Sequence, residues 1–598
     1  MNYFNLTIAF LFLLINILLS IKIKNVKVKF FHIVLAMIIT LTILVYPLMT
    51  GRTKTYILFS SFFYSFQAIS LTEDISIIKN ISLDSTLNIL YVFFIYGLFT
   101  FIPLLTVTFI LTLIDNIFNK FKLIFLKKKE LVVFSEINDR TIAISANDEN
   151  INRTKVFINN INQSDTNKIT SVKGIKISKS IINLSLENKK TKSLTYYLFS
   201  EDKSKNLEDS LKLIEKYKTT KLNINVYTLL DNEASETMLN SVDKGNVKLK
   251  IVNENERVVY NLIDKYPLYL NQTNNTINTL IVGEGNIFEE LIKTFSWCGK
   301  IPDYKLIINI LSLSDKNIKE ELISKYPEIL LNAKFNFINS NLYTKETSET
   351  LSKIKNINYI VIASSDDEKN IEYALYLRSL FMRSDSNYEN MPVINVLIRK
   401  ESINRNIKYI KNENKENLNI NSFGSISNMY GNSGILDSRI EKNAESIHLL
   451  YDKRDVSKEK KIIDYYNDNY NVKSSRAAAL HLKYKMYSVL GSNTTNNLKE
   501  DLIKFEKEKN KTEIKNKLIK GEHERWVAYM RSCGFSGIDA KEAKKYERKT
   551  NSHIHYIAKL HPFLTEFDKL KEAGDILSKK DVDKKDEEFI KNIANLLK

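Results

Sequence analysis

Cysteine is scarce in this 598-residue chain, where only Cys298 and Cys533 occur. The two lie too far apart in sequence to indicate a disulfide framework or a thiolate zinc site, so a reducing cytosol is the expected home of the soluble part. Six of the seven histidines lie beyond residue 440. The H-x-H pair His553 and His555 lacks a cysteine or carboxylate at matched spacing, so we expect no metal site.

A secretion signal is missing as well. The first apolar run lacks a basic n-region and a small-residue cleavage site, which predicts a retained membrane helix. Apolar runs of spanning length cover residues 4–21 and 30–49, and a longer one covers 87–114. Residues 1–126 are therefore expected to form a transmembrane domain with three spans.

Lysines indicate the orientation of these spans. Four lie between residues 22 and 29, and five more follow the third span between 120 and 129. The positive-inside rule places both clusters, and the C-terminal domains, on the cytoplasmic side of the inner cell membrane. The net charge of +18 includes clusters beside the apolar runs, which fits a lipid bilayer better than a nucleic acid duplex.

Residues 56–71 are apolar but short, and a fourth span here would put the C-terminal bulk outside. We predict a re-entrant or interfacial helix, followed by two acids. A span, a half-helix, carboxylates and a second span follow one another in this order in pore domains, so Gln67, Glu73 and Asp74 are pore candidates. An extracellular amphipathic loop with two solvated acids is the alternative. No T-V-G-Y-G-like filter is present, so potassium selectivity does not follow.

Beyond residue 129, short β-rich runs alternate with helical stretches, which predicts parallel, doubly wound sheets. The expected strands of a first domain, 127–275, are 131–135, 155–159, 194–200, 222–230 and 247–252. Those of a second domain, 276–400, are 279–282, 305–311, 334–338, 359–363 and 393–398. Ser200-Glu-Asp-Lys-Ser-Lys-Asn-Leu aligns without a gap on Ser364-Ser-Asp-Asp-Glu-Lys-Asn-Ile, each after an apolar strand, so we infer a tandem duplication.

The second domain opens on a strand, a glycine turn and a helix. Gly283 and Gly285 match the first two glycines of G-x-G-x-x-G, where missing side chains let backbone N–H groups approach a pyrophosphate at the helix N-terminus. Phe288 replaces the third glycine. Such turns also serve plain packing, so both interpretations stay open. The equivalent turn of the first domain has no glycine, which indicates a structural or pairing unit.

Further candidates lie at the carboxyl ends of the other strands, where parallel sheets bind ligands. Asp366 or Asp367 is expected to bind a ribose or a cation, or else to cap the following helix. The nucleotide-binding candidates are Gly283, Glu284, Gly285, Asn286, Ser312, Ser364, Asp366, Asp367 and Asn370.

The glycine turn and the run I-A-S-S-D-D-E-K-N-I-x-x-A together resemble the nucleotide-binding domains of the Trk and regulator-of-potassium-conductance family. The resemblance covers residues 278–400 and, more faintly, 130–268. It implies a Rossmann-like fold, a nucleotide such as NAD as regulatory ligand, and coupling to a membrane potassium pathway. Ser312 stands where that family usually has an acid that holds the ribose, so the identity of the nucleotide stays open. Paired domains and few spans imply a homo-oligomer, a dimer or a tetramer.

The C-terminal part is predicted as a linker at 401–422, a helical connector at 423–497 and a helical module at 498–598. The run Gly521-Glu-His-Glu-Arg-Trp-Val-Ala-Tyr-Met-Arg, followed by Lys559-Leu-His-Pro-Phe, resembles the RyR repeat of ryanodine receptors. Helical spacing puts the candidates Glu522, Arg525, Trp526 and Tyr529 on one face. A small helical core with an i,i+3 ion pair is the alternative.

This second resemblance implies that the module senses a ligand, with Arg525 on a phosphate and Trp526 or Tyr529 stacked on a base. His523 and His561 complete the candidate set. The expected fold class is thus α/β with N-terminal transmembrane helices, two tandem doubly wound Rossmann-like domains and an α-helical RyR-like module.

The function expected from these patterns is that of a ligand-gated membrane protein, a cation channel or channel-like effector with potassium as one candidate ion. A nucleotide-type ligand on the Rossmann-like and RyR-like domains would control it. A membrane-anchored nucleotide sensor without its own pore is the alternative. An NAD-dependent enzyme is least favoured, because no recognisable catalytic constellation accompanies the glycine turn.

Overall fold

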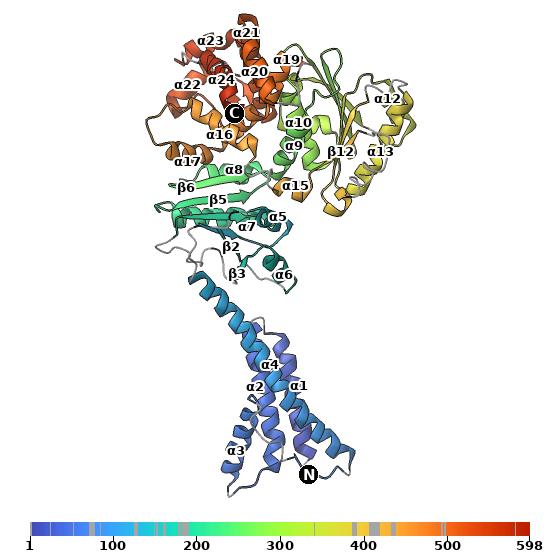
Figure 1. Ribbon diagram of the computed structural model, residues 1–598, viewed down its shortest axis with the longest axis vertical. Coiled ribbons are helices and arrows are strands. Elements are labelled where there is room, and N and C mark those ends of the chain that lie inside the picture. The colour runs from blue at the N-terminus through green and yellow to red at the C-terminus, as the bar shows by residue number, and fades with distance from the viewer. Residues whose placement is uncertain are drawn as a thin grey trace. The chain divides into compact units, whose positions relative to one another are not determined.

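The computed structural model in Figure 1 divides into two compact units, Met1–Leu126 and Lys127–Lys598. The first unit is helical, and the second combines parallel sheets with helices. The structure describes residues 3–23, 26–51, 53–70, 78–79, 81–83, 85–124, 130–148, 150, 153–158, 163–177, 181, 191–339, 341–384, 391–405, 419–431, 438–491, 494, 498–579 and 582–597.

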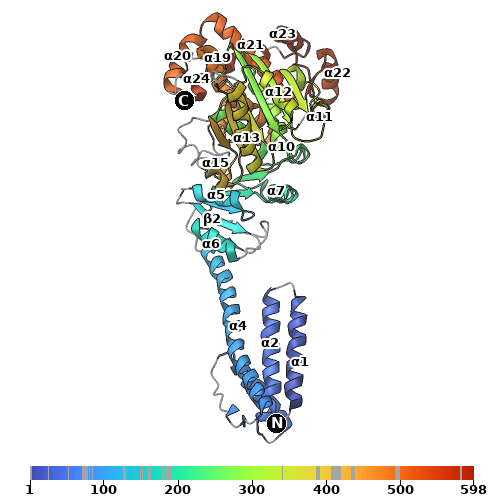
Figure 2. The same cartoon turned by 90° about the vertical axis from the view of Figure 1, so that its right-hand side faces the viewer.

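Among the described residues of the first unit, three helices are long and apolar enough to cross a membrane, and they match the three apolar runs of the sequence. They are α1 (Tyr3–Ile21), α2 (Val26–Val45) and α4 (Thr86–Ile124), and α1 lies beside α2 in Figure 2. Many large apolar side chains on them are exposed, Phe93 at 76% among them. Lipid is the solvent that suits such a surface.

The short apolar segment forms α3 (Lys54–Gln67), and its 14 residues fall short of the length of a spanning helix. One face buries Tyr64 and two serines, while several phenyl side chains on the other face are exposed. Gln67 is the last residue of α3. The other pore candidates, Glu73 and Asp74, lie outside the described residues.

The second unit contains two six-stranded parallel sheets. The first has the order β3-β2-β1-β4-β5-β6, with β1 (Glu130–Phe134), β2 (Arg153–Ile158), β3 (Ile175–Ile177), β4 (Ser193–Leu198), β5 (Asn223–Leu229) and β6 (Val247–Val252). The second has the order β12-β11-β10-β7-β8-β9, with β7 (Thr276–Gly283), β8 (Lys305–Ser312), β9 (Lys334–Asn339), β10 (Tyr359–Ala363), β11 (Val393–Leu397) and β12 (Ile420–Phe423). Numbered within each sheet, both orders are 3-2-1-4-5-6, the Rossmann arrangement.

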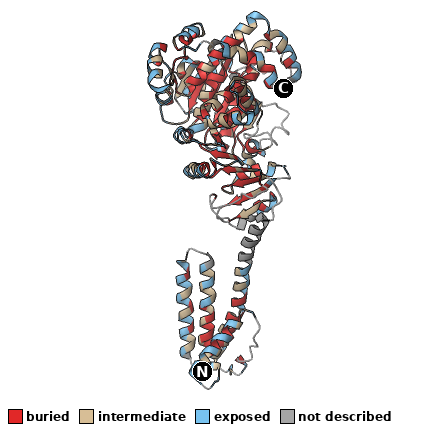
Figure 3. Cartoon of the chain, turned by 90° about the vertical axis from the view of Figure 1, so that its left-hand side faces the viewer, coloured by how far each residue is buried: buried red, intermediate tan, exposed pale blue. Residues whose placement is uncertain are grey.

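Burial explains why most of these strands are visible in the sequence. Helices cover parallel sheets on both faces, so their strands are continuous apolar runs, and all five residues of β10 are buried. Figure 3 shows the buried residues concentrated in the strands. Two strands escaped prediction. β3 has only three residues, and β12 lies in the polar stretch expected to be a linker.

Helices connect the strands. In the first fold they are α5 (Asp139–Asn147), α6 (Gln163–Ser171), α7 (Lys203–Tyr217), α8 (Glu233–Asn240) and α9 (Glu254–Lys265). In the second they are α10 (Gly285–Cys298), α11 (Ile318–Lys325), η3 (Ile329–Leu331), α12 (Lys345–Lys353) and α13 (Asp367–Ser384), with α15 (Ile426–Tyr430) after β12.

The C-terminal part is helical. The connector contains α16 (Arg439–Tyr451), α17 (Lys458–Asn467), α18 (Asn469–Leu480) and α19 (Leu482–Leu490). The C-terminal module, which the sequence predicts to be RyR-like, contains α20 (Leu498–Lys509), α21 (Thr512–Ser532), α22 (Ala540–Thr550), α23 (Phe567–Ile576), α24 (Val582–Leu597) and the short parallel pair β13 (Ser536–Gly537) and β14 (Leu560–His561). α17 packs on β6 of the first fold, and α21 packs on α10 of the second.

Candidate functional site

The glycine turn of the second fold has a backbone reason for its first glycine. A Cβ at Gly283 would clash with the carbonyl oxygen of Ala363 on β10. The same carbonyl accepts the N–H of Glu284 at 3.0 Å, so the turn is fastened to the neighbouring strand. Gly285 has φ of +81°, in the left-handed region that favours glycine. Close packing against β10 is thus sufficient to require glycine at position 283, and both interpretations of the turn stay open.

The helix after this turn starts without a side-chain cap. Glu284 occupies the N-cap of α10 and makes no cap hydrogen bond, while Asn286 in the first turn is exposed. Uncapped N–H groups of this kind are what a bound anion uses. Phe288, at the third-glycine position, is 1% exposed and fills the space below the turn.

The remaining nucleotide candidates make local hydrogen bonds. Ser312 at the end of β8 accepts the Ser314 N–H at 3.3 Å. Asp366 caps α13 through the N–H groups of Glu368 and Lys369, which lowers its pKa. Asp367 accepts backbone N–H groups from Arg399 and Lys400 just beyond β11, at 3.0 and 2.7 Å. Asp366 therefore caps a helix, which is the alternative to ligand binding that the sequence offered for it.

Asn370 and Ser364 form a buried bridge between strand ends. The Asn370 amide accepts the Ser364 N–H at 2.9 Å and donates to the carbonyl oxygens of Ser364 and Leu397. Its side chain is fully buried. Gly283, Ser312 and Ser364 thus lie together at the carboxyl ends of β7, β8 and β10. Asn370 instead joins the end of β10 to the end of β11.

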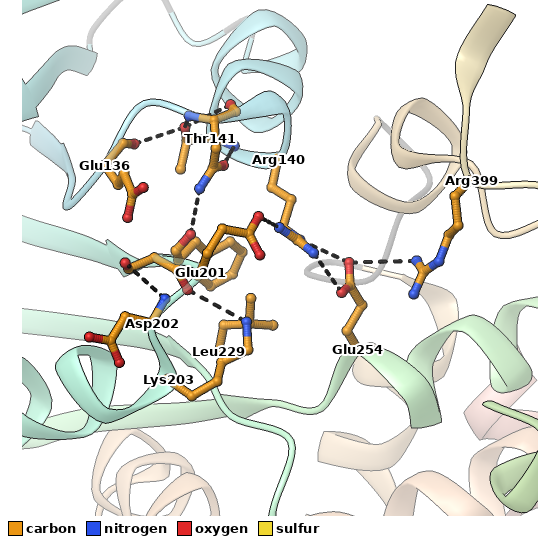
Figure 4. A network of polar contacts seen from close by, with 12 residues as sticks. Glu136, Arg140, Thr141, Glu201, Asp202, Lys203, Leu229, Glu254 and Arg399 are labelled. Carbon is orange, nitrogen blue, oxygen red and sulfur yellow. Dashed lines mark hydrogen bonds and ion pairs between the residues drawn. The ribbon is translucent and has the colours of Figure 1, made fainter. Parts of the chain in front are cut away.

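An ion-pair network lies at the carboxyl ends of the strands of the first fold, as Figure 4 shows. Arg140, on the helix after β1, donates two hydrogen bonds to Glu254 at 3.0 Å each and also pairs with Glu201. Tyr430 donates to Glu254 at 3.0 Å, and Arg399 of the second fold lies 3.8 Å from it. The first fold therefore has a structural link to the second where a nucleotide would bind.

A cavity of about 660 Å³ lies between the connector and the RyR-like module. Its size suits a small-molecule ligand. Glu522, His523, Arg525, Trp526 and His561 line it, so five of the six predicted candidates of the module come together at one site. The opposite wall belongs to the connector.

Glu522 and Arg525 form a buried ion pair at the base of the cavity. Arg525 is 1% exposed and donates from Nε and Nη2 to the two Glu522 oxygens, at 3.0 and 2.8 Å. The Lys485 ammonium lies 2.5 Å from the same carboxylate. Burial would raise the pKa of Glu522, but these two cations lower it, so the carboxylate stays ionised. The i,i+3 pair of the structural alternative is present, yet it faces a cavity.

Aromatic rings form the next part of the lining. The Trp526 indole stands edge-on to the His561 imidazole, with ring centroids 5.1 Å apart. His561 accepts the Phe563 N–H through Nδ1 at 3.1 Å, so its proton is assigned to Nε2. His523 Nε2 lies 2.9 Å from the Thr565 carbonyl oxygen and is therefore protonated too. Both imidazoles are fixed in orientation by backbone groups.

No family model and no curated protein matches this chain. Among solved structures, the crystal structure of GsuK bound to ADP is similar to it. That similarity covers 67% of this chain and 95% of the GsuK chain, at 10% sequence identity and a TM-score of 0.32. The function must therefore be inferred from the chain's own residues.

Tyr529, the sixth candidate, lies away from the cavity. Its ring packs edge-on against Trp297 of α10, with centroids 5.5 Å apart, and the Arg525 guanidinium lies 5.8 Å from the Trp297 ring centre. Asn332 also donates to the Ala528 carbonyl oxygen at 2.8 Å. This face of α21 docks the module on the helix that begins at the glycine turn.

Several lining residues had no signal in the sequence. His448 and Arg454 come from the connector, and Asp586 comes from a helix whose sequence is simply rich in lysine and acids. Burial, and then the neighbouring Glu522, raise the pKa of Asp586 to about 8. A carboxyl group that is protonated at neutral pH is typical of a functional site, although ion-pair networks with a purely structural role also raise carboxyl pKa values.

Proposed function

We propose that this chain is a ligand-regulated membrane protein, with the cavity between connector and RyR-like module as its sensing site. One observation supports the proposal most. Residues singled out from helical spacing, Glu522, Arg525 and Trp526, line a cavity with a second wall from a separate helical segment. Three helices able to cross a membrane precede these domains in the chain.

The two cavity walls make their larger contacts with different α/β folds. Smaller cross-contacts exist, because Lys559 of the module pairs with Glu233 of the first fold and His481 of the connector lies 3.1 Å from the Lys300 carbonyl oxygen of the second. The connector wall is tied to the first fold by ion pairs. Arg257 of the first fold and Arg476 of the connector both pair with the buried Glu441 of the connector. Lys473 of the connector pairs with Glu236 of the first fold. The module wall is tied to the second fold through α10 and through Arg531, which pairs with Glu328 at 3.1 Å. A ligand that bridges the walls would favour one relative arrangement of the two folds.

Such a change would reach the membrane helices through the first fold. α4 ends at Ile124 and β1 begins at Glu130, so only a few residues separate them in the chain. Glu254 pairs with Arg140 of the first fold and lies 3.8 Å from Arg399 of the second, so a relative movement of the two folds would act on these ion pairs. Regulation further requires that the ligand bind the two arrangements with different affinity.

The uncapped N-terminus of α10 is a second, anion-binding position within this proposal. Its occupant would be a nucleotide phosphate, since the turn leaves backbone N–H groups free of a side-chain cap. Because α10 packs on α21, this position is mechanically connected to the cavity. We propose a regulatory role for it and no catalytic one.

As effector we propose a cation path formed by several copies of the chain, because so few spans cannot enclose a pore alone. The test is cation flux into liposomes that contain the purified full-length protein, before and after removal of small molecules that co-purify with it. Flux that changes with removal and returns when the extract is added back supports the channel. The absence of flux in every condition, with a ligand identified by mass spectrometry, favours the sensor without a pore.

A further inference from the structure

We propose that the cavity takes an uncharged heteroaromatic group of nucleoside size, and that a diphosphate or triphosphate is excluded from it. This inference rests on the proposed sensing role of the same cavity. We argue it from the contacts of the charged and aromatic residues that line the cavity. The resemblance to a ligand-sensing module implied a phosphate on Arg525, and the geometry points away from that role.

The guanidinium groups of the lining donate from most of their nitrogens to carboxylates. Arg454 donates to Asp452 from Nε and Nη2, at 2.9 and 2.6 Å, and to Asp464 from Nη1 at 2.8 Å. Arg525 spends its Nε and Nη2 groups on Glu522. Polyphosphate sites instead offer free guanidinium forks to the ligand.

The overall charge of the lining is close to balanced. Its cations are Arg454, Arg525 and Lys585, and they face the carboxylates Asp452, Asp464, Asp468 and Glu522. Asp586 adds no charge at neutral pH, because its pKa is raised to about 8. A ligand with two or more phosphates would bring several negative charges into a partly buried site without matching free cations, which is unfavourable.

The histidines of the lining are neutral hydrogen-bonding groups. Burial lowers the pKa of His561 to about 3, and it also lowers the pKa values of His448, His523 and His553. A neutral imidazole has one donor and one acceptor. Backbone groups use the acceptor Nδ1 of His561 and the donor Nε2 of His523, so His561 keeps a donor and His523 keeps an acceptor. Such groups recognise the ring nitrogens and exocyclic amines of a heterocycle.

One lining residue, Arg525, also has an unused donor. Nη1 of Arg525 is buried and has no hydrogen-bond partner among the described residues. A carbonyl oxygen or ring nitrogen of the ligand would satisfy it, and leaving a buried donor unpaired is costly. The Trp526 ring, edge-on to His561, supplies an aromatic surface at the same site.

The chain offers a direct optical test, because Trp297 and Trp526 are its only tryptophans. A Trp297→Phe variant of the full-length protein in detergent makes Trp526 the sole indole reporter and keeps an aromatic ring against Tyr529. Its fluorescence is titrated with adenosine, AMP, ADP and ATP at constant ionic strength. Wild-type protein is titrated in parallel by calorimetry, which does not depend on the substitution.

We expect adenosine to bind, and ADP to bind more weakly by about tenfold or more, a difference of about 1.4 kcal/mol. Tyr556→Ala should weaken adenosine binding, because Tyr556 lines the cavity. Tyr343→Ala is the matched control, since both tyrosines are 53% exposed and Tyr343 lies outside the lining. ADP or ATP binding that is as tight as that of adenosine and is weakened as much by Tyr556→Ala would overturn the proposal, whereas tight binding that does not depend on Tyr556 belongs to the α10 position. No binding by any of the four at millimolar concentration overturns the proposal too. Adenosine binding without any effect on ion flux would instead count against the proposed function.

Discussion

Asn206 and Asn370 make the same hydrogen bonds in the two α/β folds. Asn206 accepts the Ser200 N–H at 2.9 Å and donates to the carbonyl oxygens of Ser200 and Leu229. Asn370 does the same with Ser364 and Leu397. Each amide thus joins the end of the fourth strand to the end of the fifth. The motif that the two copies share therefore has a structural role. This role explains why the motif is present in the first fold, which has no glycine turn.

Asn370→Ala is therefore expected to destabilise the protein. It leaves a buried N–H and two carbonyl oxygens without partners, at a cost of about 2–4 kcal/mol in the free energy of unfolding. Urea unfolding of the protein in detergent measures this cost. Asn206→Ala should cost a similar amount, and the exposed Asn286→Ala should cost little. Full stability with a selective loss of nucleotide binding would show that Asn370 is a ligand residue.

The buried pair below the cavity should behave as a coupled unit. Glu522→Gln and Arg525→Met are each expected to cost about 3–5 kcal/mol of stability, because each leaves a buried charge without its partner. The double variant should cost less than the two single costs added together, by about 2 kcal/mol. A double-mutant cycle in urea measures the coupling. The exposed pair Lys453 and Glu588, 2.7 Å apart, is the matched control and should show much weaker coupling.

Acid should weaken the attachment of the connector to the first fold. Burial would raise the pKa of Glu441, but Arg257 and Arg476 lower it from 4.5 to about 2. A folded pKa below the unfolded one adds stability above pH 4.5 that is lost as pH falls toward 2, and here it amounts to about 3 kcal/mol. Stability measured against pH should show this loss.

Glu441→Gln is the variant that tests this assignment. It should lower stability at neutral pH and flatten the dependence between the two pKa values, because the carboxylate is gone. Glu524→Gln, at an exposed position of α21, should leave the curve unchanged. An unaltered acid transition in the Glu441 variant would assign the loss to other carboxylates.

Asp586 should produce the opposite dependence on pH. Its folded pKa of about 8 exceeds the unfolded value of 3.8, so its stabilising contribution is complete below the unfolded value and is lost as pH rises toward 8. Asp586→Asn is expected to be more stable than wild type at pH above 8, by at most about 6 kcal/mol, and equal to it only below the unfolded pKa of 3.8. Thermal unfolding in detergent at several pH values measures the difference. The groups around Asp586 are Glu522, His523 and Arg525 of α21, Lys485 and Lys585.

The strands were largely predictable because a parallel sheet buries both faces and leaves continuous apolar runs. The exceptions follow from the same physics. β3 contributes three residues, one of them Lys176, and β12 is an edge strand whose Asn421 and Ser422 are only half-buried. Too few apolar residues remained in either to contrast with a loop.

The part of the cavity lining that lies on α21 was also predictable from the sequence. Glu522, Arg525 and Trp526 share one helix, so spacing alone puts them on one face. His448 and Asp586 come from other helices, and only the tertiary fold brings them to the same site. Spacing also grouped Tyr529 with the ligand candidates, although the helix turns it toward Trp297.

The most direct test of the account is cation flux into liposomes containing the full-length protein, measured with and without adenosine for the wild type, Trp526→Ala and Tyr343→Ala. We predict a flux that changes when adenosine is added to the wild type and to Tyr343→Ala, and that does not respond in Trp526→Ala, because Trp526 lines the cavity. Equal responses in all three proteins would contradict the claim that this cavity regulates the membrane helices, and no flux in any condition would contradict the proposed cation path.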